Sequence, residues 1–230
     1  MAAEADKRIN DALRTSAPVL DLSALKLRTL PETLAGLTSL THLRLNFNEL
    51  GELPEWLGTL TSLTQLELAG NRLHELPESL LRLGALQELG LAGHRLKELP
   101  EWSSGLHSLT SLDLSDGELE ELPEWMGNLT SLRMLDVHGN NLSELPDSLG
   151  SLASLTRLDV AGNPISELPD SLATLHALAE LDLTDTYLSK LPKWLKKLPS
   201  LERIDLNGDD FDKIPKWAAH LVVDGADFPA

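Results

Sequence analysis

Five aspartates recur at a constant interval of 23 residues, which sets their carboxylates in register if the chain is built from repeats of that length. They are Asp113, Asp136, Asp159, Asp182 and Asp205. Carboxylates in such a row can bind lysine and arginine side chains of a partner, or a hard cation such as calcium. His138 and Ser115, together with these aspartates, also supply the residue types of acid–base and nucleophilic catalysis. Which chemistry is possible depends on the elements that position these side chains.

A Leu-Pro dipeptide recurs with the same period, from Leu30-Pro31 to Leu191-Pro192, and Ile214-Pro215 continues it. Between the dipeptides the pattern reads LPxxLxxLxxLxxLxLxxNxLxx. A fixed period of this length predicts a solenoid, in which each repeat buries its apolar residues against its neighbours. The alternation in LxxLxLxxN predicts one short strand per repeat, and each Leu-Pro is expected to open a short helical or 3-10 turn.

This pattern resembles the leucine-rich repeat family over roughly residues 17–228, in the 23-residue form of intracellular Ras-suppressor-type scaffolds and bacterial members. The resemblance implies an α/β fold: a right-handed solenoid with a concave parallel sheet, convex 3-10 turns and an N-terminal capping helix. We expect this helix in residues 1–16, the repeats in 17–213 and a C-terminal cap in 214–230. Members of this class are non-catalytic recognition arrays that use the concave sheet, and the opening segment is similar to bacterial examples.

The concave sheet is therefore where we expect a partner to bind. In the predicted register the five aspartates form one outward-facing column, with other polar side chains beside it. The expected partner-binding residues are Asp113, Asp116, Met134, Asp136, His138, Arg157, Asp159, Glu180, Asp182 and Asp205. Two alternatives stay open: the aspartates are solvated side chains bonded to neighbouring arginines, or they bind calcium.

The sequence argues against an enzyme, a metal site and a cofactor. Of seven histidines only His42 and His138 fall on the predicted concave sheet, four repeats or about 19 Å apart, so they cannot share a metal ion. Glycine-rich phosphate loops and GxSxG motifs are absent from the sequence. The cluster of Ser115, Asp113, Asp116, Asp136 and His138 is the one with a catalytic inventory, but an open sheet does not exclude water.

The net charge of the chain limits the kinds of partner that it can bind. The net charge of −17 excludes a phosphate-backbone binder and disfavours anionic membranes, so we expect a basic protein or peptide, no nucleic acid and no membrane. The chain has no cysteine and no apolar run typical of a signal peptide or membrane span, which favours a cytoplasmic protein, with a bacterial envelope as the alternative. The bacterial origin that we expect is what the resemblance of the opening segment implies. We expect a monomer. An inhibitor or immunity protein that blocks a basic toxin or enzyme is the alternative function.

Three further patterns concern the edges and ends of the solenoid. Acidic residues flank the Leu-Pro in successive repeats, as in Glu52 and Glu55, but lysines replace them in the last two, which would permit weak head-to-tail association. The lysines are Lys190, Lys193, Lys213 and Lys216. All five tryptophans share one position after the Leu-Pro, where packing between repeats is the main interpretation and a convex binding surface at Trp102 and Trp125 the other. The capping interpretation rests on Ile9, Ala12 and Leu13 at one end and on Val222, Val223 and Phe228 at the other.

Overall fold

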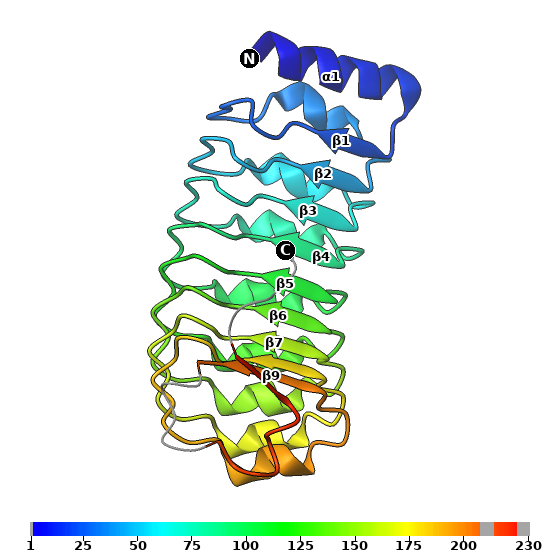
Figure 1. Ribbon diagram of the computed structural model, residues 1–230. Coiled ribbons are helices and arrows are strands. Elements are labelled where there is room, and N and C mark those ends of the chain that lie inside the picture. Colours follow the sequence, from blue (N-terminus) through cyan, green and yellow to red (C-terminus); the bar gives the residue numbers. More distant parts are fainter. Residues whose placement is uncertain (1, 208–213, 225–230) are drawn as a thin grey trace.

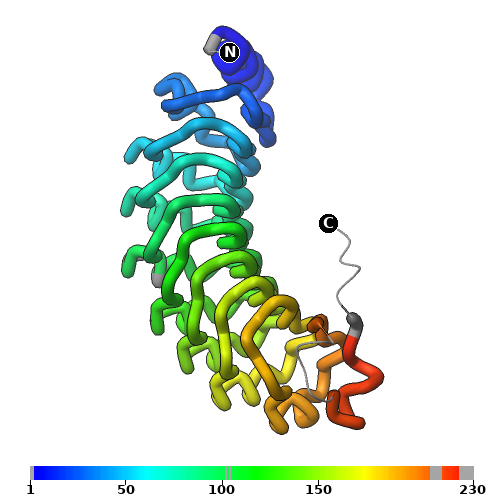
Figure 2. Tube along the Cα trace, turned by 60° about the vertical axis from the view of Figure 1, so that its left-hand side comes forward, coloured from blue at the N-terminus to red at the C-terminus, as the bar shows by residue number. Residues whose placement is uncertain are grey.

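The computed structural model describes residues 2–207 and 214–224, which form a curved, right-handed solenoid (Figures 1 and 2). Helix α1 (Ala2–Thr15) precedes a parallel sheet whose ten strands follow the order of the chain. The strands are β1 (Val19–Asp21), β2 (His42–Arg44), β3 (Gln65–Glu67), β4 (Glu88–Gly90), β5 (Ser111–Asp113), β6 (Met134–Asp136), β7 (Arg157–Asp159), β8 (Glu180–Asp182), β9 (Arg203–Leu206) and β10 (Val222–Asp224). The predicted fold class is confirmed, with the sheet on the inner side of the curve.

Short 3-10 helices form the outer side of the solenoid, one after each Leu-Pro through the eighth repeat. They are η1 (Glu32–Gly36), η2 (Glu55–Thr59), η3 (Glu78–Arg82), η4 (Glu101–Gly105), η5 (Glu124–Asn128), η6 (Asp147–Ser151), η7 (Asp170–Thr174) and η8 (Lys193–Lys197). Each proline is the N-cap, where its missing N–H costs no hydrogen bond and its fixed φ suits the turn. In η6 the Pro146 carbonyl accepts from the Leu149 N–H at 3.2 Å.

Leucine fills the interior. Each strand turns its central residue inward, and Leu43, Leu66, Leu135 and Leu158 have no exposed surface. Because consecutive strands pair leucine with leucine in exact register, the same side chain repeats along the whole core. The first and third positions of β2 to β7 lie on the concave face and are partly or fully exposed. At the third position of the next two strands, Asp182 and Asp205 are buried to 6% and 2% exposure, so the predicted outward-facing aspartate column is open to solvent only as far as Asp159.

An asparagine ladder, formed by the asparagine of the repeat pattern, runs beside this core. Asn140, buried to 5% exposure, donates to the carbonyls of Leu114 and Val137 at 2.9 and 3.0 Å and accepts from the Leu119 N–H at 3.0 Å. Asn48, Asn71 and Asn163 make equivalent bonds. These side chains satisfy backbone groups that the turn after each strand leaves unpaired inside the solenoid.

Two consecutive repeats interrupt the ladder with His94 and Gly117. His94 is buried to 3% exposure, and neither ring nitrogen has a well-formed hydrogen bond within the described residues. Burial lowers the pKa of His94 to about 4, against smaller opposing effects of the Leu68 backbone and Asp113. The ladder thus has a gap between Asn71 and Asn140, and it ends after Asn163, where Thr186 stands at the next equivalent position.

Helix α1 covers the N-terminal end of the solenoid, and one further strand follows the last repeat at the other end. Ala5, Ile9 and Ala12 of α1 are buried, whereas Leu13 remains 39% exposed because it lies on the margin of the apolar face. At the other end β10 adds a strand to β9, with Val222 paired to Ile204. Phe228, the remaining residue of the expected C-terminal seal, lies outside the described residues.

The tryptophan column packs between repeats. Trp194 is buried, and Trp56, Trp125 and Trp217 are half-buried against the leucine core. The side chain of Trp102 lies outside the described part of the chain, so the suggested Trp102–Trp125 surface is represented by Trp125 alone. For the four described rings, packing is the observed role.

Candidate functional site

The sheet brings the five aspartates into one column on the concave face. The strand register pairs Asp113 with Asp136, Asp136 with Asp159, Asp159 with Asp182 and Asp182 with Asp205. Adjacent strands in a sheet lie about 4.8 Å apart, so each carboxylate has like charges as its nearest cross-strand neighbours. The predicted alignment of these residues is confirmed by the pairing.

Four of these carboxylates also have a local structural role that the sequence analysis did not identify. In each, an Oδ1 atom accepts from the backbone N–H two residues later, where the strand ends: Ser115 for Asp113 at 3.0 Å, His138 for Asp136 at 3.1 Å, Ala161 for Asp159 at 3.0 Å and Thr184 for Asp182 at 2.8 Å. Asp21 binds Ser23 in the same way. Aspartate suits this position because its short side chain reaches its own backbone.

One open interpretation was that each aspartate of the column is bonded to a neighbouring arginine. This pairing is found for Asp205, the last aspartate of the column. Arg203 donates to both carboxylate oxygens of Asp205, at 2.8 and 3.0 Å from Nε. Arg157 forms an ion pair with Glu180 at 3.3 Å, in the neighbouring column. The central aspartates are therefore bonded mainly to backbone, and their negative charge is only partly offset.

The electrostatic consequence is clearest in the centre of the column. Burial, with the nearby charges of Asp136 and Asp182, raises the pKa of Asp159 to about 6. Burial also raises the pKa of Asp182, and the charge of Asp205 adds to this effect despite the hydrogen bonds from Thr184. Both shifts show that the concave face holds negative charge at a cost in stability.

His138 belongs to this centre. Its Nδ1 lies 2.7 Å from Asp136 Oδ1, and its Nε2 lies 3.6 Å from Asp116 Oδ1. Burial lowers the pKa of His138, but the hydrogen bond to Asp136 and the charges of Asp136, Asp159 and Asp116 together raise it above its ordinary value. A protonated imidazole here would neutralise part of the aspartate column.

The residues around His138 that could take part in catalysis do not form a nucleophile–base pair, because Ser115 and His138 are not hydrogen-bonded to each other. The Ser115 hydroxyl donates to Asp113 Oδ1 at 2.6 Å, while His138 is hydrogen-bonded to Asp136. Activation of a serine requires the base within hydrogen-bond reach of the hydroxyl. In the described structure the two side chains bond to different aspartates in adjacent repeats instead.

A different grouping does have the spacing of metal ligands. One ring nitrogen of His138 and one carboxylate oxygen each of Asp136 and Asp159 lie within 4.8 Å of one another. Nitrogen and oxygen ligands of this kind suit divalent ions such as zinc. The distance between His42 and His138 does not reveal this group, because its other two ligands are aspartates. Its signal in the sequence is the motif Asp136-x-His138, followed one repeat later by Asp159.

The remaining predicted residues surround the column. Met134, Arg157 and Glu180 occupy the first position of β6, β7 and β8, and Met134 is 38% exposed. The sequence analysis missed Phe47, which is 69% exposed at a positive φ of 56°. The signal was an aromatic residue where other repeats have Gly70, Gly93, Gly139 and Gly162.

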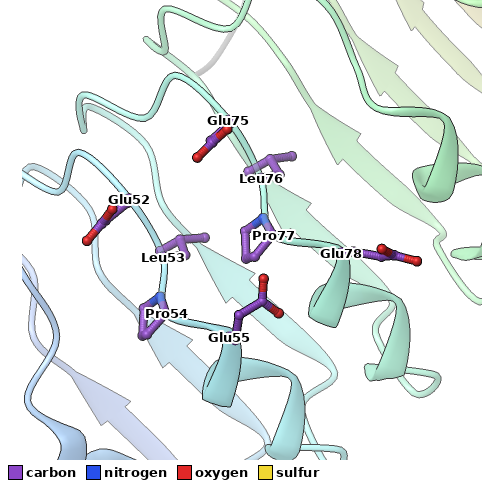
Figure 3. Close-up of a pocket in the computed structure, with 8 residues that line it drawn as sticks. All are labelled: Glu52, Leu53, Pro54, Glu55, Glu75, Leu76, Pro77 and Glu78. Atoms are coloured by element: carbon purple, nitrogen blue, oxygen red, sulfur yellow. The ribbon is translucent and has the colours of Figure 1, made fainter.

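A second acidic surface lies along the side of the solenoid, where residues flank each Leu-Pro; we call it the Leu-Pro edge. Figure 3 shows Glu52, Glu55, Glu75 and Glu78 around a groove of about 540 Å³ over two Leu-Pro units. A similar groove of about 330 Å³ is lined by Glu144, Asp147, Glu167 and the adjoining Leu-Pro units. The edge therefore repeats an open, acidic hollow between consecutive turns.

Comparisons with known families agree with this architecture. A leucine-rich repeat region model matches residues 126–221, and two leucine-rich repeat models match residues 85–142 and 39–60. The chain belongs to the leucine-rich repeat family. Arrays of this family are typically non-catalytic protein-interaction modules, which agrees with the separation of Ser115 from His138. No curated protein matches the chain in a sequence search.

Solved structures of bacterial and plant leucine-rich repeat proteins share the fold. A protein of Leptospira interrogans has a TM-score of 0.72 at 23% identity, with 92% of this chain and 72% of that chain covered. Internalin C2 of Listeria monocytogenes has a TM-score of 0.75 at 24% identity, with 87% and 91% covered. The ectodomain of the Arabidopsis thaliana receptor kinase GASSHO1/SCHENGEN3, solved in complex with CASPARIAN STRIP INTEGRITY FACTOR 2, has a TM-score of 0.70 at 35% identity. The match covers 89% of this leucine-rich repeat chain and 26% of the receptor chain. Among the described residues no helix is long and apolar enough to cross a membrane.

Proposed function

We propose that this leucine-rich repeat protein binds a basic protein or peptide on its acidic concave face. The observation that carries the proposal is the central part of the aspartate column, where Asp136, Asp159 and Asp182 are adjacent in the sheet and the pKa of Asp159 is raised to about 6. Lysine or arginine side chains placed over this column would replace repulsion between carboxylates with attraction. Binding would therefore relieve a cost that the free protein carries.

The surroundings of the column favour a protein surface or peptide over a small cation. Met134 offers exposed apolar area beside Asp136, and Arg157 with Glu180 offers an ion pair that can exchange partners. A mixture of apolar contact and charge is typical of interfaces, in which charge steers association and buried apolar residues slow dissociation. A partner with lysines or arginines around an apolar residue would match this arrangement.

The test uses a fluorescent octalysine peptide as the probe, with binding followed by anisotropy at low and high salt. The variant Asp136→Lys with Asp159→Lys reverses the centre of the column. The matched control, Glu52→Lys with Glu75→Lys, makes the same change in net charge on the Leu-Pro edge, away from the sheet. We expect the concave variant to lose octalysine binding by about ten-fold or more, and the control to lose far less.

The comparison between the two variants decides the proposal. If both variants lose the same affinity, the peptide responds to net charge and the concave face has no special role. If the edge variant alone loses binding, the binding surface is the edge and the assignment is wrong. Circular dichroism of both variants checks that the fold is retained.

A further inference from the structure

We propose that two copies of the chain associate antiparallel through the C-terminal part of their Leu-Pro edges. The basis is a reversal of charge along this edge. Repeats are numbered here by their Leu-Pro, so that repeat 6 contains Leu145-Pro146 and repeat 9 contains Ile214-Pro215. Repeats 2 to 7 have an acidic residue on both sides of the dipeptide, whereas repeats 8 and 9 have lysine on both sides.

These charges are free to meet a partner. In repeats 6 and 7 the exposed carboxylates are those of Glu144, Asp147, Glu167 and Asp170; the exposed described lysines are Lys190, Lys193 and Lys216. Within the described residues none of these side chains takes part in an intramolecular ion pair, although ion pairs form on the concave face and on α1. The chain thus leaves unpaired opposite charges in adjacent repeats of one edge.

Symmetry selects how two such edges fit. When two copies lie side by side and antiparallel about a two-fold axis, repeat i of one copy faces repeat j of the other, and the sum i + j is constant. With the axis between repeats 7 and 8, repeat 7 faces repeat 8 and repeat 6 faces repeat 9, so every facing pair joins acid to lysine. Moving the axis by half a repeat in either direction sets repeat 7 or repeat 8 against itself. Only the first register has no like-charge pair among the overlapping repeats.

The spacing along the edge also suits this register. Both edges come from the same chain and therefore have the same spacing between repeats, so repeat 6 can meet repeat 9 when repeat 7 meets repeat 8. Lys190 then faces Glu167, Lys193 faces Asp170 and Lys216 faces Asp147, and the two-fold axis doubles each contact. The groove lined by Glu144, Asp147 and Glu167 is an open hollow of about 330 Å³ that can receive lysine side chains. Because the contact is isologous, it closes as a dimer rather than a filament.

The association is expected to be weak and salt-dependent. Exposed ion pairs are individually weak, and the net charge of −17 on each copy opposes approach. At about 0.1 M salt, charges more than about 10 Å apart are largely screened, while facing side chains in contact are screened less. Dimer formation should therefore be strongest near this salt concentration and lost near 1 M.

Charge exchange between two variants tests the register by sedimentation velocity of the full chain. One variant carries Lys190→Glu, Lys193→Glu and Lys216→Glu, so that repeats 8 and 9 become acidic at these positions. The other carries Asp147→Lys, Glu167→Lys and Asp170→Lys, so that the facing positions are basic. We expect the wild type to dimerise, each variant alone to bind itself at least about ten-fold more weakly, and their 1:1 mixture to dimerise again.

A matched control replaces the second variant with Glu52→Lys, Glu55→Lys and Glu75→Lys, which makes the same charge change in repeats 2 and 3. The control keeps repeats 6 to 9 unchanged, so it is expected to dimerise with itself as the wild type does. In the mixture it is not expected to recruit the lysine-to-glutamate variant, because facing repeats 2 and 3 of one copy to repeats 8 and 9 of the other also sets the acidic repeats 4 to 7 of the two copies against each other. The proposal is overturned if the wild type is monomeric at 0.1 M salt up to millimolar concentration. It is also overturned if the charge-exchanged mixture fails to dimerise, or if the lysine-to-glutamate variant or the acid-to-lysine variant alone dimerises as well as the wild type.

Discussion

Replacing His94 with asparagine is expected to stabilise the protein by an amount that grows as the pH falls. His94 stands where the ladder needs an amide, is 3% exposed and lacks a well-formed hydrogen bond. At the equivalent position Asn71 donates to the carbonyls of Leu45 and Leu68 at 3.0 and 2.6 Å and accepts from the Leu50 N–H at 3.1 Å. The substitution His94→Asn should restore bonds of this kind.

The magnitude at neutral pH follows from these bonds. A buried hydrogen bond contributes about 1 kcal/mol net, so three contribute about 3 kcal/mol. Loss of the packed imidazole ring removes part of this gain, about 1 to 2 kcal/mol, because a smaller side chain leaves space in the core. We therefore expect His94→Asn to raise the free energy of unfolding by about 1 to 2 kcal/mol at pH 7.

The pH dependence comes from the pKa of His94, which burial lowers to about 4 in the folded protein from 6.5. Between these values the unfolded chain binds the proton and the folded chain does not, so the wild type loses stability as the pH falls from 6.5 towards 4. Linkage gives a loss of about 2 kcal/mol between pH 7 and pH 5, with a limit of about 3 kcal/mol at lower pH. The variant lacks this group and escapes the loss.

Urea titrations of both proteins at pH 7, 6 and 5 measure the effect, and the difference between them cancels the titration of other groups. His74→Asn is the matched control, because His74 is exposed one repeat earlier. We expect its difference from the wild type to stay below about 0.5 kcal/mol. If the free energy of unfolding of His94→Asn exceeds that of the wild type by the same amount at pH 7 and pH 5, His94 is not a buried, neutral histidine in the folded protein. A loss of stability at pH 7 would refute the ladder argument.

Two further substitutions test the column and the core. The raised carboxyl pKa of Asp159 costs the folded protein stability above about pH 6, and this cost disappears as the pH falls below that value. The substitution Asp159→Asn removes the carboxylate, so it should stabilise the protein by about 1 to 2 kcal/mol at pH 8 and by little near pH 4. Equal stabilisation at both values, in the same urea assay, would mean that charge is not the cause. Leu135→Ala, at a position with no exposed surface, should cost about 2 to 5 kcal/mol, while Met134→Ala beside it on the exposed face should cost under about 0.5 kcal/mol. Similar losses for the two would contradict the strand register.

The aspartate column and the Leu-Pro edge are separate surfaces, so partner binding on the first and dimerisation through the second would not compete. Asp136 and Asp159 of the column lie on the concave sheet, whereas Glu167 and Lys190 flank the Leu-Pro dipeptides on the side of the solenoid. A dimer formed through the edge would leave both concave faces accessible. Each copy could then bind its own basic partner, which raises apparent affinity for a partner with two binding segments.

The sequence by itself determined the fold and the alignment of the site. With one strand per 23-residue repeat, residues separated by one period must face the same way, so the repeat alone places Asp136 and Asp159 side by side. The same argument identified Leu135 as inward and Asn140 as a ladder residue, because a solenoid buries the positions that stay apolar or amide in most repeats. The repeat period determines whether a side chain points into the core or toward the concave face, and these predictions required only that information.

The tertiary structure decided which groups each side chain meets. Asp113 and Asp136 bond to the backbone two residues ahead, and Ser115 bonds to Asp113 instead of His138, because these partners depend on the rotamer and on the shape of the strand end. Burial likewise follows from neighbours in three dimensions: Trp125 is half-buried between turns, while Phe47 projects over a repeat that has only glycine at the matching position. A repeat pattern specifies where a side chain starts, but contacts between turns determine its hydrogen bonds, its exposure and its pKa.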